Sequence, residues 1–291
     1  MLKKSLIFTT LSIFFILIVY AYSFYQNNKD MKFPENSEIR NSLNKSINWL
    51  ESNRKTIESN NNPALWWMIK EASEASRIEE LNAIYDNYEE KYLQKNPPNI
   101  WTPYFSKYYK PNVPDILQLR NLRDYQIFFI YALSCDNDLK SEPVIQKQLK
   151  VDFCSFHFLH PRCITHQLMG IRLMQQRNCG ENELLQSVSS ELTDIIQKEL
   201  TWDFRVGDAY IQRTLMLAES GKFNLIKPVW INRILDAQNA DGGWDDIHPF
   251  LTFHNGKILG LSSTLPVLKH SKSDFHATAQ GIWLLSLLLK K

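Results

Sequence analysis

The stretch that decides the fold is Lys227-Pro-Val-Trp-Ile-Asn-Arg-Ile-Leu-Asp-Ala-Gln-Asn-Ala-Asp-Gly-Gly-Trp244. It joins an aromatic and aliphatic helix to a Gln-x3-Gly-x-Trp ending, in which Gln238 precedes Trp244. Thirty residues after Trp244, Asp274 opens a second apolar helix. A helix, a glycine-rich turn and another helix together predict stacked helical hairpins.

The same pattern, a polar start followed by an apolar helix, recurs along the chain. The starts are Asp124, Ile164, Asp208 and Asp274. In three of them an aspartate can act as the N-cap, and Thr165 can do so in the fourth. Two residues further on come Gln126, His166, Tyr210 and His276. Other helices are expected between them at 142–150, 181–200 and 228–239, and a period of about forty residues predicts a helical repeat array.

We therefore predict an all-α protein whose helical hairpins form an α/α toroid or a partial toroid. The apolar helices would be buried inside and would alternate with outer helices that are polar on one side. Further helices are predicted at 38–53, 64–75 and 81–93, an ordered aromatic loop at 101–109, and an inserted loop at 245–272. Strand candidates are scarce. The expected organisation is an N-terminal membrane segment (1–29), an N-terminal helical part (30–119) and a toroid-like domain (120–291).

Trp230–Trp244 resembles the Gln-Trp repeat of triterpene cyclases, and residues 120–291 are similar to the α/α-toroid superfamily, which includes protein prenyltransferase β-subunits. The resemblance implies the fold, with Gln238 stapling neighbouring hairpins and Trp244 stacking beside it. It implies no catalytic residues. The chain has no Asp-x-Asp-Asp motif, and no cysteine follows Asp245 to complete a prenyltransferase zinc set.

The N-terminus carries an uncharged run of 21 residues from Ser5 to Tyr25, which is just long enough to cross a hydrocarbon layer of about 30 Å as a helix. Lys3 and Lys4 precede it, and three tyrosines lie near its far end. The alternative is a cleaved signal peptide ending near Ala21-Tyr-Ser23. We favour a transmembrane anchor through residues 5–25, because the run is longer than a usual signal core. Either reading places the bulk of the chain outside the cytoplasm.

Composition narrows the partners. With 291 residues, 44% of them hydrophobic, the chain can bury a substantial core. A net charge of +2, with no Arg/Lys stripe, gives no basis for nucleic-acid binding.

Four cysteines, Cys135, Cys154, Cys163 and Cys179, lie within 45 residues. Outside the cytoplasm one or two disulfides would form, and three full pairings stay open. The run Cys154, His157, His160, Cys163 and His166 could instead supply metal ligands. Residues spaced by three drift around a helix, so the five cannot converge, and buried cysteines beside bonded histidines are the favoured reading.

The helix starts are the stronger site candidates, because inner helices of a toroid run parallel and gather their N-termini at one mouth. Asp124, His166, Asp208 and His276 would ring that mouth as acid–base residues. Tyr210, Gln212, Arg213, Gln280 and Trp244 would bind substrate, with Gln126 below the rim. His166, Asp208 and His276 are also the candidate ligands of a zinc ion. The rival interpretation is that each aspartate only caps its helix, but caps do not explain why His166 and His276 recur at one offset.

Two other clusters have simpler readings. The loop 241–256 holds Asp241, Asp245, Asp246, His248 and His254, which could bind a metal but are more typical of a solvated loop. Trp66-Trp67 and the aromatics of 101–109 could line a groove for sugar or lipid, and at helical spacing they are more typical of core.

Two functions follow from these patterns, and the sequence does not reveal the reaction. One is an enzyme, a hydrolase, lyase or transferase acting on a lipid-like or glycan substrate at the toroid mouth. The other is a non-catalytic binding or scaffold module that uses the same concave surface.

Overall fold

The computed structural model describes residues 2–106, 108–154, 162–254, 256–261 and 265–291. The α-helices are α1 (Leu2–Asn28), α2 (Asn36–Ser52), α3 (Arg54–Ile57), α4 (Pro63–Ser76), α5 (Glu79–Tyr88), α6 (Asp124–Ser134), α7 (Asn137–Lys140), α8 (Pro143–Gln148), α9 (Cys163–Arg177), α10 (Asn182–Trp202), α11 (Asp208–Glu219), α12 (Pro228–Asp236) and α13 (Phe275–Lys290). The strands are β1 (His248–Thr252), β2 (Lys257–Leu261) and β3 (Pro266–His270). Short turns of other helix types cover Glu89–Gln94, Thr102–Tyr104, Val151–Cys154 and Phe223–Leu225. The prediction of a mainly helical protein is confirmed.

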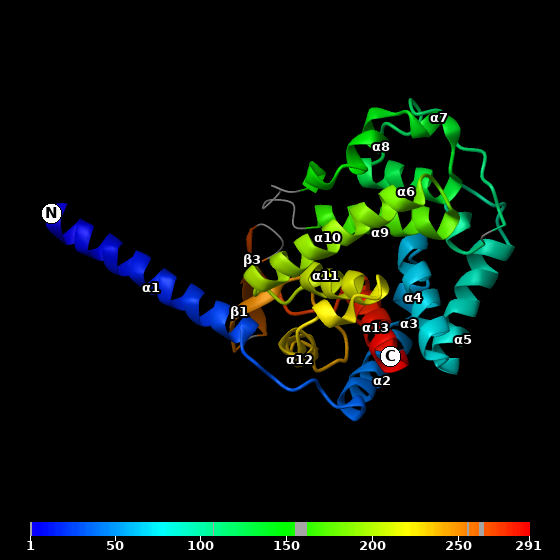
Figure 1. Cartoon of the computed structure of the whole chain (residues 1–291). Helices are drawn as coiled ribbons and strands as arrows, with labels where there is room; N and C mark the ends of the chain where they lie inside the picture. Colours follow the sequence, from blue (N-terminus) through cyan, green and yellow to red (C-terminus); the bar gives the residue numbers. More distant parts are fainter. Residues whose placement is uncertain (1, 107, 155–161, 255, 262–264) are drawn as a thin grey trace.

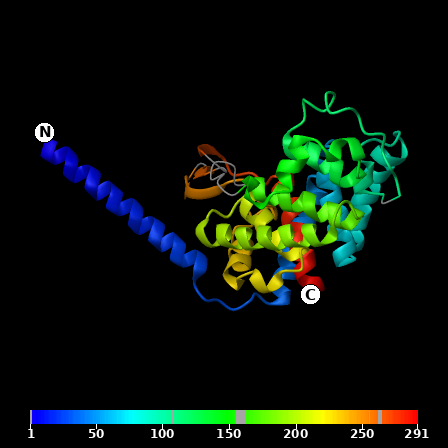
Figure 2. The ribbon, with the colours of Figure 1, turned by 45° about the horizontal axis from the view of Figure 1, so that its top comes forward.

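The inserted segment expected as a loop instead forms a small antiparallel sheet in the order β1-β2-β3. Its central strand buries Ile258 and Gly260 on one face, because β2 packs that face against the helical body. A side chain at Gly260 would stand 2.5 Å from the carbonyl oxygen of His248. The sheet lies on the same side of the helical body as α1 (Figure 2). Three short strands were missed because only one of them has a buried face, which leaves a weak period-two signal.

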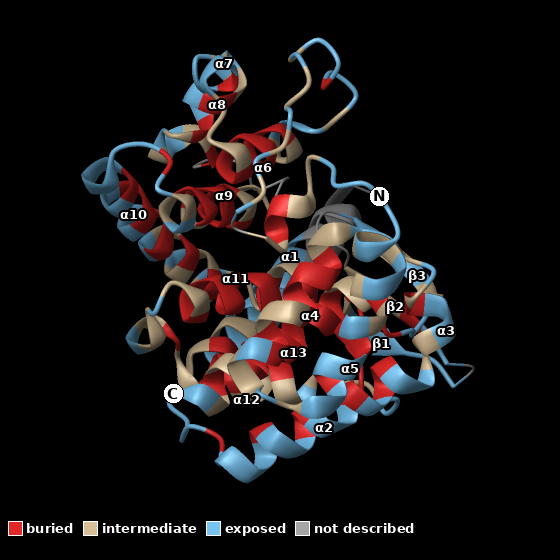
Figure 3. Ribbon diagram, turned by 90° about the vertical axis from the view of Figure 1, so that its right-hand side faces the viewer, coloured by how far each residue is buried: buried red, intermediate tan, exposed pale blue. Residues whose placement is uncertain are grey.

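Five helices lie side by side in the order α6, α9, α11, α13 and α4, each packed on the next. They hold most of the buried side chains of the body (Figure 3). Helix α13 also packs on α2, so a single hydrophobic core includes residues from near both ends of the body, such as Ile39 of α2 and Leu288 of α13. The N-terminal helical part and the later hairpins therefore share a single core.

Most predicted helix positions hold, and the caps differ in detail. Asp274 does cap α13, since its carboxylate accepts from the backbone nitrogens of His276 and Ala277 at 2.9 and 3.1 Å. Asp124 and Asp208, which were the predicted N-caps, are instead the first residues of α6 and α11, and the N-cap positions belong to Arg123 and Gly207. The carboxylate of Asp208 is thereby released from capping and points elsewhere.

The Gln-Trp segment has a structural role. The side-chain nitrogen of Gln238 donates to the carbonyl oxygens of Ser42 and Gly242, and its oxygen accepts from the Ser42 hydroxyl, so it ties α2 to the turn after α12. The Trp244 indole is 1% exposed and donates to the carbonyl oxygen of Ile234 at 2.8 Å. Its ring fills the space left by Gly281 on α13.

Helix α1 projects from the body as a single helix, and only its C-terminal end is packed (Figure 1). That end is fixed by Asn27, whose side chain donates to the carbonyl oxygen of Leu200 and accepts from the Tyr210 hydroxyl. Within the described part of the chain, no helix combines the length and apolar character needed to cross a membrane. The structure therefore lends no support to the transmembrane helix predicted through residues 5–25.

Two disulfides join Cys135 to Cys179 and Cys154 to Cys163. The first links the end of α6 to the end of α9, and the second closes onto the first residue of α9. This settles the pairing that the sequence left open.

Candidate functional site

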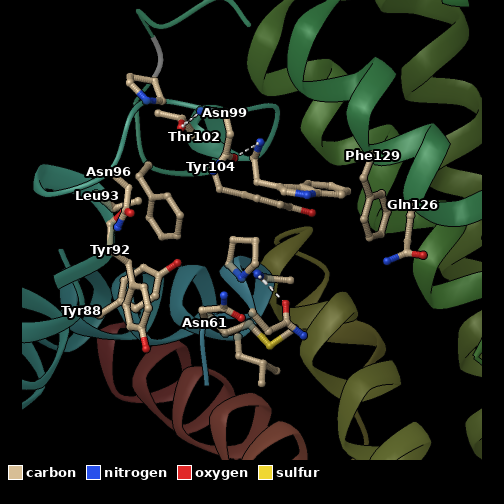
Figure 4. A pocket seen from close by; sticks show the side chains of 18 of the residues that line it. Asn61, Tyr88, Tyr92, Leu93, Asn96, Asn99, Thr102, Tyr104, Gln126 and Phe129 are labelled. Atoms are coloured by element: carbon tan, nitrogen blue, oxygen red, sulfur yellow. Dashed lines mark hydrogen bonds between the residues drawn. The ribbon is translucent and has the colours of Figure 1, made fainter. Parts of the chain in front are cut away.

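A cavity of about 920 Å³ opens where the N-terminal ends of α4, α6, α9 and α13 meet, within the size range of small-molecule sites. The turns between Tyr88 and Phe105 form its other wall, and Tyr104 faces Phe129 of α6 across the space (Figure 4). His166, Gln212 and His276 lie on the helical wall. The N-terminal ends of these helices therefore bring two of the predicted histidines to one cavity.

Asp208 and His276 form the polar centre behind this wall. Asp208 is 1% exposed, and its Oδ1 lies 2.7 Å from Nδ1 of His276. Helices α11 and α13 pack directly on each other, which places the first turn of one beside the first turn of the other. The His276 side chain is still 31% exposed toward the cavity.

Gln280 completes this pair one helical turn along α13. In the amide orientation that satisfies every partner, its nitrogen donates to Oδ1 and to the carbonyl oxygen of Asp208, both at 3.1 Å. Its oxygen then accepts from Nε2 of His276 at 3.2 Å. Both ring nitrogens of His276 are thus placed as donors, which is the arrangement of an imidazolium.

Arg162 supplies the second positive charge beside Asp208. Its Nε lies 2.9 Å from Oδ2, close enough for an ion pair although the atoms are not aligned as a hydrogen bond. The Arg162 side chain is 40% exposed, whereas the carboxylate is buried. Arg162 directly precedes Cys163, so the second disulfide holds the backbone from which it extends.

His166 approaches the cavity from α9. Its ring stacks on Tyr125 with centroids 4.3 Å apart and meets the edge of Phe129 at 6.1 Å. One residue earlier, the Thr165 hydroxyl donates to the side-chain oxygen of Gln212 at 2.7 Å. Aromatic rings therefore surround the imidazole and reduce its contact with water.

These surroundings move the three ionisable groups in different directions. Burial, together with the nearby charge of His276, lowers the pKa of His166 to about 4 against the opposing charge of Asp208. Burial alone would lower the pKa of His276 and raise that of Asp208. The attraction between the two outweighs burial in both, so the pKa of His276 is raised and the pKa of Asp208 is lowered.

Two imidazoles that face one cavity therefore have pKa values shifted in opposite directions, downward for His166 and upward for His276. Pairs of titratable groups whose pKa values are driven apart are the usual arrangement of a general base and a general acid. His166 is the group able to accept a proton, and the Asp208–His276 pair is the group able to stabilise negative charge or donate a proton.

Several predicted site residues lie elsewhere. Asp124 is exposed at the start of α6, does not line the cavity, and offers its backbone oxygen to Gln148. Tyr210 is fully buried and bonds Asn27. Arg213 is buried in ion pairs with Glu199 and Asp203 at 2.7 and 2.8 Å. Trp244 belongs to the core. Asp124, Tyr210 and Arg213 point away from the mouth because a helix presents only part of its circumference to it, whereas Trp244 lies between α12 and β1 and not on a helix.

The described residues contain no group of three or more His, Cys, Asp or Glu side chains arranged to hold a metal ion. Nδ1 of His276 is engaged with Asp208, so these two predicted zinc ligands bind each other. Cys154 and Cys163 are bonded to each other as well, and His157 and His160 lie outside the described residues. The zinc prediction finds no support in this geometry.

Two of the acidic side chains of the loop 241–256 make structural contacts within the protein. Asp241 accepts from the Ser273 hydroxyl at 2.6 Å and from the Trp49 indole at 3.2 Å. Asp245 is buried and lies 2.7 Å from Nζ of Lys269. Burial raises the pKa of Asp245, and burial likewise lowers that of His248 to about 4. Together these contacts attach the sheet to the helical body.

The sequence did not single out three kinds of site residue. Arg162 escaped notice because it lies inside the stretch read as a cysteine and histidine cluster. Tyr125 lies beside a predicted helix start, within a run whose apolar pattern predicts only core packing. Tyr88 and Tyr92 lie within the helix predicted at 81–93, and that pattern gives them no role in a site. A signal for the last pair exists in the dense aromatic run from Tyr85 to Tyr109.

Comparison of the chain with protein-family models, with curated proteins and with solved structures finds no match. The function must be argued from the geometry of the site.

Proposed function

We propose that this protein is an enzyme that acts by general acid–base catalysis in the cavity at the inner-helix N-termini. It would be a hydrolase, lyase or transferase acting on a lipid-like or glycan substrate. The observation that carries the proposal is the opposed titration of His166 and His276 on one cavity wall. Shifted pKa values of this kind are concentrated at functional sites in clefts.

His166 would accept the proton that the reaction removes, because it is neutral and lines the cavity. His276 would stabilise the negative charge that develops on the substrate, because Asp208 and Gln280 keep it cationic and in place. Arg162 offsets the second oxygen of Asp208, so that a buried carboxylate does not repel an approaching anion.

The mechanism of most glycosidases, which uses two carboxylate side chains, fits this cavity poorly. Among the described residues, no Asp or Glu side chain lines the cavity. A proton-transfer reaction that relies on imidazoles agrees better with this lining.

Two wider proposals accompany this one. The arc α6, α9, α11, α13 and α4 supports a partial α/α toroid, since consecutive inner helices touch and their first turns meet at one mouth. The two disulfides support an oxidising location outside the cytoplasm, where such bonds persist. Single-pass anchoring by residues 5–25 stays a prediction.

The test uses the purified full chain with panels of polyprenyl phosphates and oligosaccharides, and follows conversion by mass spectrometry. His166→Gln should lower kcat by about a hundredfold or more, in line with the loss of a general base. His254→Gln, a histidine exposed on the loop 241–256, is the matched control and should leave kcat unchanged. Full turnover by the His166 variant would refute the assignment, and binding without turnover in the wild type would favour the scaffold function.

A further inference from the structure

The cavity has a lining that distinguishes between the two substrate classes. Four aromatic side chains, Tyr92, Trp101, Phe105 and Tyr125, are only half-buried, so parts of their rings remain accessible. They come from three separate segments and border one space. Exposed ring faces can stack on the flat C–H faces of sugars or contact an isoprenoid chain equally well. The aromatics alone therefore do not decide.

The polar rim does decide. The carboxamides Asn61, Asn96, Asn99 and Gln126 border the same cavity and point along its edge (Figure 4). Asn96 already donates to two backbone oxygens, and Asn99 and Gln126 each accept from a backbone nitrogen, so each of these three keeps one further amide atom for a ligand. A hydrocarbon ligand would remove water from those remaining atoms and pair with none of them, at a cost of about 1–3 kcal/mol for each atom left unpaired. A sugar offers hydroxyl groups at matching density. The combination of ring faces and carboxamides favours a glycan.

Two buried donors face the cavity without a partner in the described structure. Gln212 is fully buried, its oxygen is taken by Thr165, and its Nε2 has no hydrogen-bond partner. The Tyr104 hydroxyl is also buried and unpaired, and burial raises the pKa of that phenol, so it stays protonated. Buried donors are almost always satisfied in folded proteins. An acceptor-rich ligand would satisfy both.

The charges of the wall have one sign. Lys91 lines the cavity, the contact with Asp208 favours the charged form of His276, and no carboxylate side chain of a described residue lines this cavity. Asp208 lies behind the wall with both oxygens engaged. A ligand bearing carboxylates would meet cations and neutral donors without meeting a like charge.

We propose that this cavity binds an acidic glycan, a short chain of sugars that carry carboxylates. The rings hold the sugar faces, the carboxamide rim pairs with hydroxyl groups, and Gln212 and Tyr104 donate to acceptor oxygens deep in the cavity. The inference rests on the proposed function, because it names the substrate on which His166 and His276 would act.

The binding test uses the full chain and isothermal titration with tetramers of galacturonate and of mannuronate. Each acid is compared with its own methyl ester, which keeps the sugar and removes the charge, and with farnesyl phosphate as the lipid probe. At least one acidic tetramer should bind about tenfold or more tightly than its ester, since hydrogen bonds to charged groups are the stronger ones.

Three variants connect that preference to the cavity. Tyr104→Phe removes one oxygen from a ring that keeps its packing, and Gln212→Leu removes the unpaired amide. Each should weaken binding of the acid by about fivefold or more and leave the weak binding of the ester unchanged. Trp101→Ala should weaken both, and Trp202→Ala, a tryptophan 60% exposed and outside the cavity, should weaken neither.

Equal or tighter binding of the esters or of farnesyl phosphate would overturn the proposal, and so would the absence of binding by every probe. The outcome for the proposed function is separate. An acidic tetramer that binds but is never converted would leave the ligand assignment standing and remove the catalytic one. If a neutral or lipid probe were converted, and the conversion depended on His166, the catalytic assignment would stand and the ligand assignment would be removed.

Discussion

The buried carboxylate of Asp208 provides the sharpest test of the site. Asp208→Asn keeps the shape of the side chain and removes its charge. The change turns one of the two oxygen atoms that lie 2.7 Å from His276 and 2.9 Å from Arg162 into an amide nitrogen and leaves the other as an uncharged oxygen. The amide nitrogen then lies where only donors point, so at least one contact becomes repulsive.

Removing one member of a buried ion pair costs about 3–5 kcal/mol. Arg162 and His276 are 40% and 31% exposed, so water can solvate them in the variant, and we expect a loss near the lower limit, about 3 kcal/mol. For a chain of this size that corresponds to a fall in Tm of about 6–12 °C.

Asp208→Asn should also reverse the direction in which the pKa of His276 is shifted. With Asp208 present, attraction outweighs burial and the pKa of His276 is raised. Without it burial dominates, and the pKa should fall below the ordinary value of about 6.5. NMR titration of the histidine ring protons measures this directly.

The pH dependence of stability has a defined sign in the wild type. The raised pKa of His276 stabilises the fold at pH below about 6.5, and this contribution disappears as pH rises through the folded-state pKa. The lowered pKa of Asp208 stabilises the fold above about pH 4 and is lost as pH falls through its folded-state value. Both contributions should vanish in Asp208→Asn.

Asp136→Asn is the matched control, because it makes the same chemical change at the N-cap of α7, where asparagine caps equally well. Its Tm should stay within about 2 °C of the wild type. A similarly small change in Asp208→Asn, or a His276 that still titrates above 6.5, would refute the charge network as the centre of the site.

Three further predictions concern stability. Between pH 6.5 and 4 the wild type should lose up to about 3 kcal/mol of stability, because the unfolded state binds a proton that the buried ring of His166 resists. His166→Gln should abolish this loss, which urea unfolding across the same pH range measures. If the variant still loses stability over that range, the lowered pKa of His166 is wrong. Gly281→Ala should cost about 1–3 kcal/mol by overpacking, because its new methyl would stand 2.6 Å from the Trp244 ring, and unchanged unfolding would mean that the ring can move. Replacing Cys135 and Cys179 by alanine should lower the free energy of unfolding by about 4 kcal/mol, and replacing Cys154 and Cys163 should lower it by about 2.5 kcal/mol. The first loss is larger because that disulfide closes a loop of 44 residues and the second closes one of 9. Denaturant midpoints in the opposite order would contradict this explanation by loop entropy.

Local sequence patterns predicted the helices well because apolar periodicity and caps are local properties. The runs after Asp208 and after Asp274 were expected to form buried helices, and both helices are buried on almost every side. The sheet was missed because two of its strands are largely exposed and bury no regular face.

The sequence alone determined that His166, Asp208 and His276 recur at related offsets of buried helices, because that spacing is written in the chain. Which of them meet was decided only by tertiary packing. The direct contact between α11 and α13 pairs Asp208 with His276, whereas the rotation of each helix turns Tyr210 and Arg213 toward other neighbours. Arg162 joined the site because the fold of α9 brings it there, and no local pattern encodes the direction in which a side chain leaves a helix start.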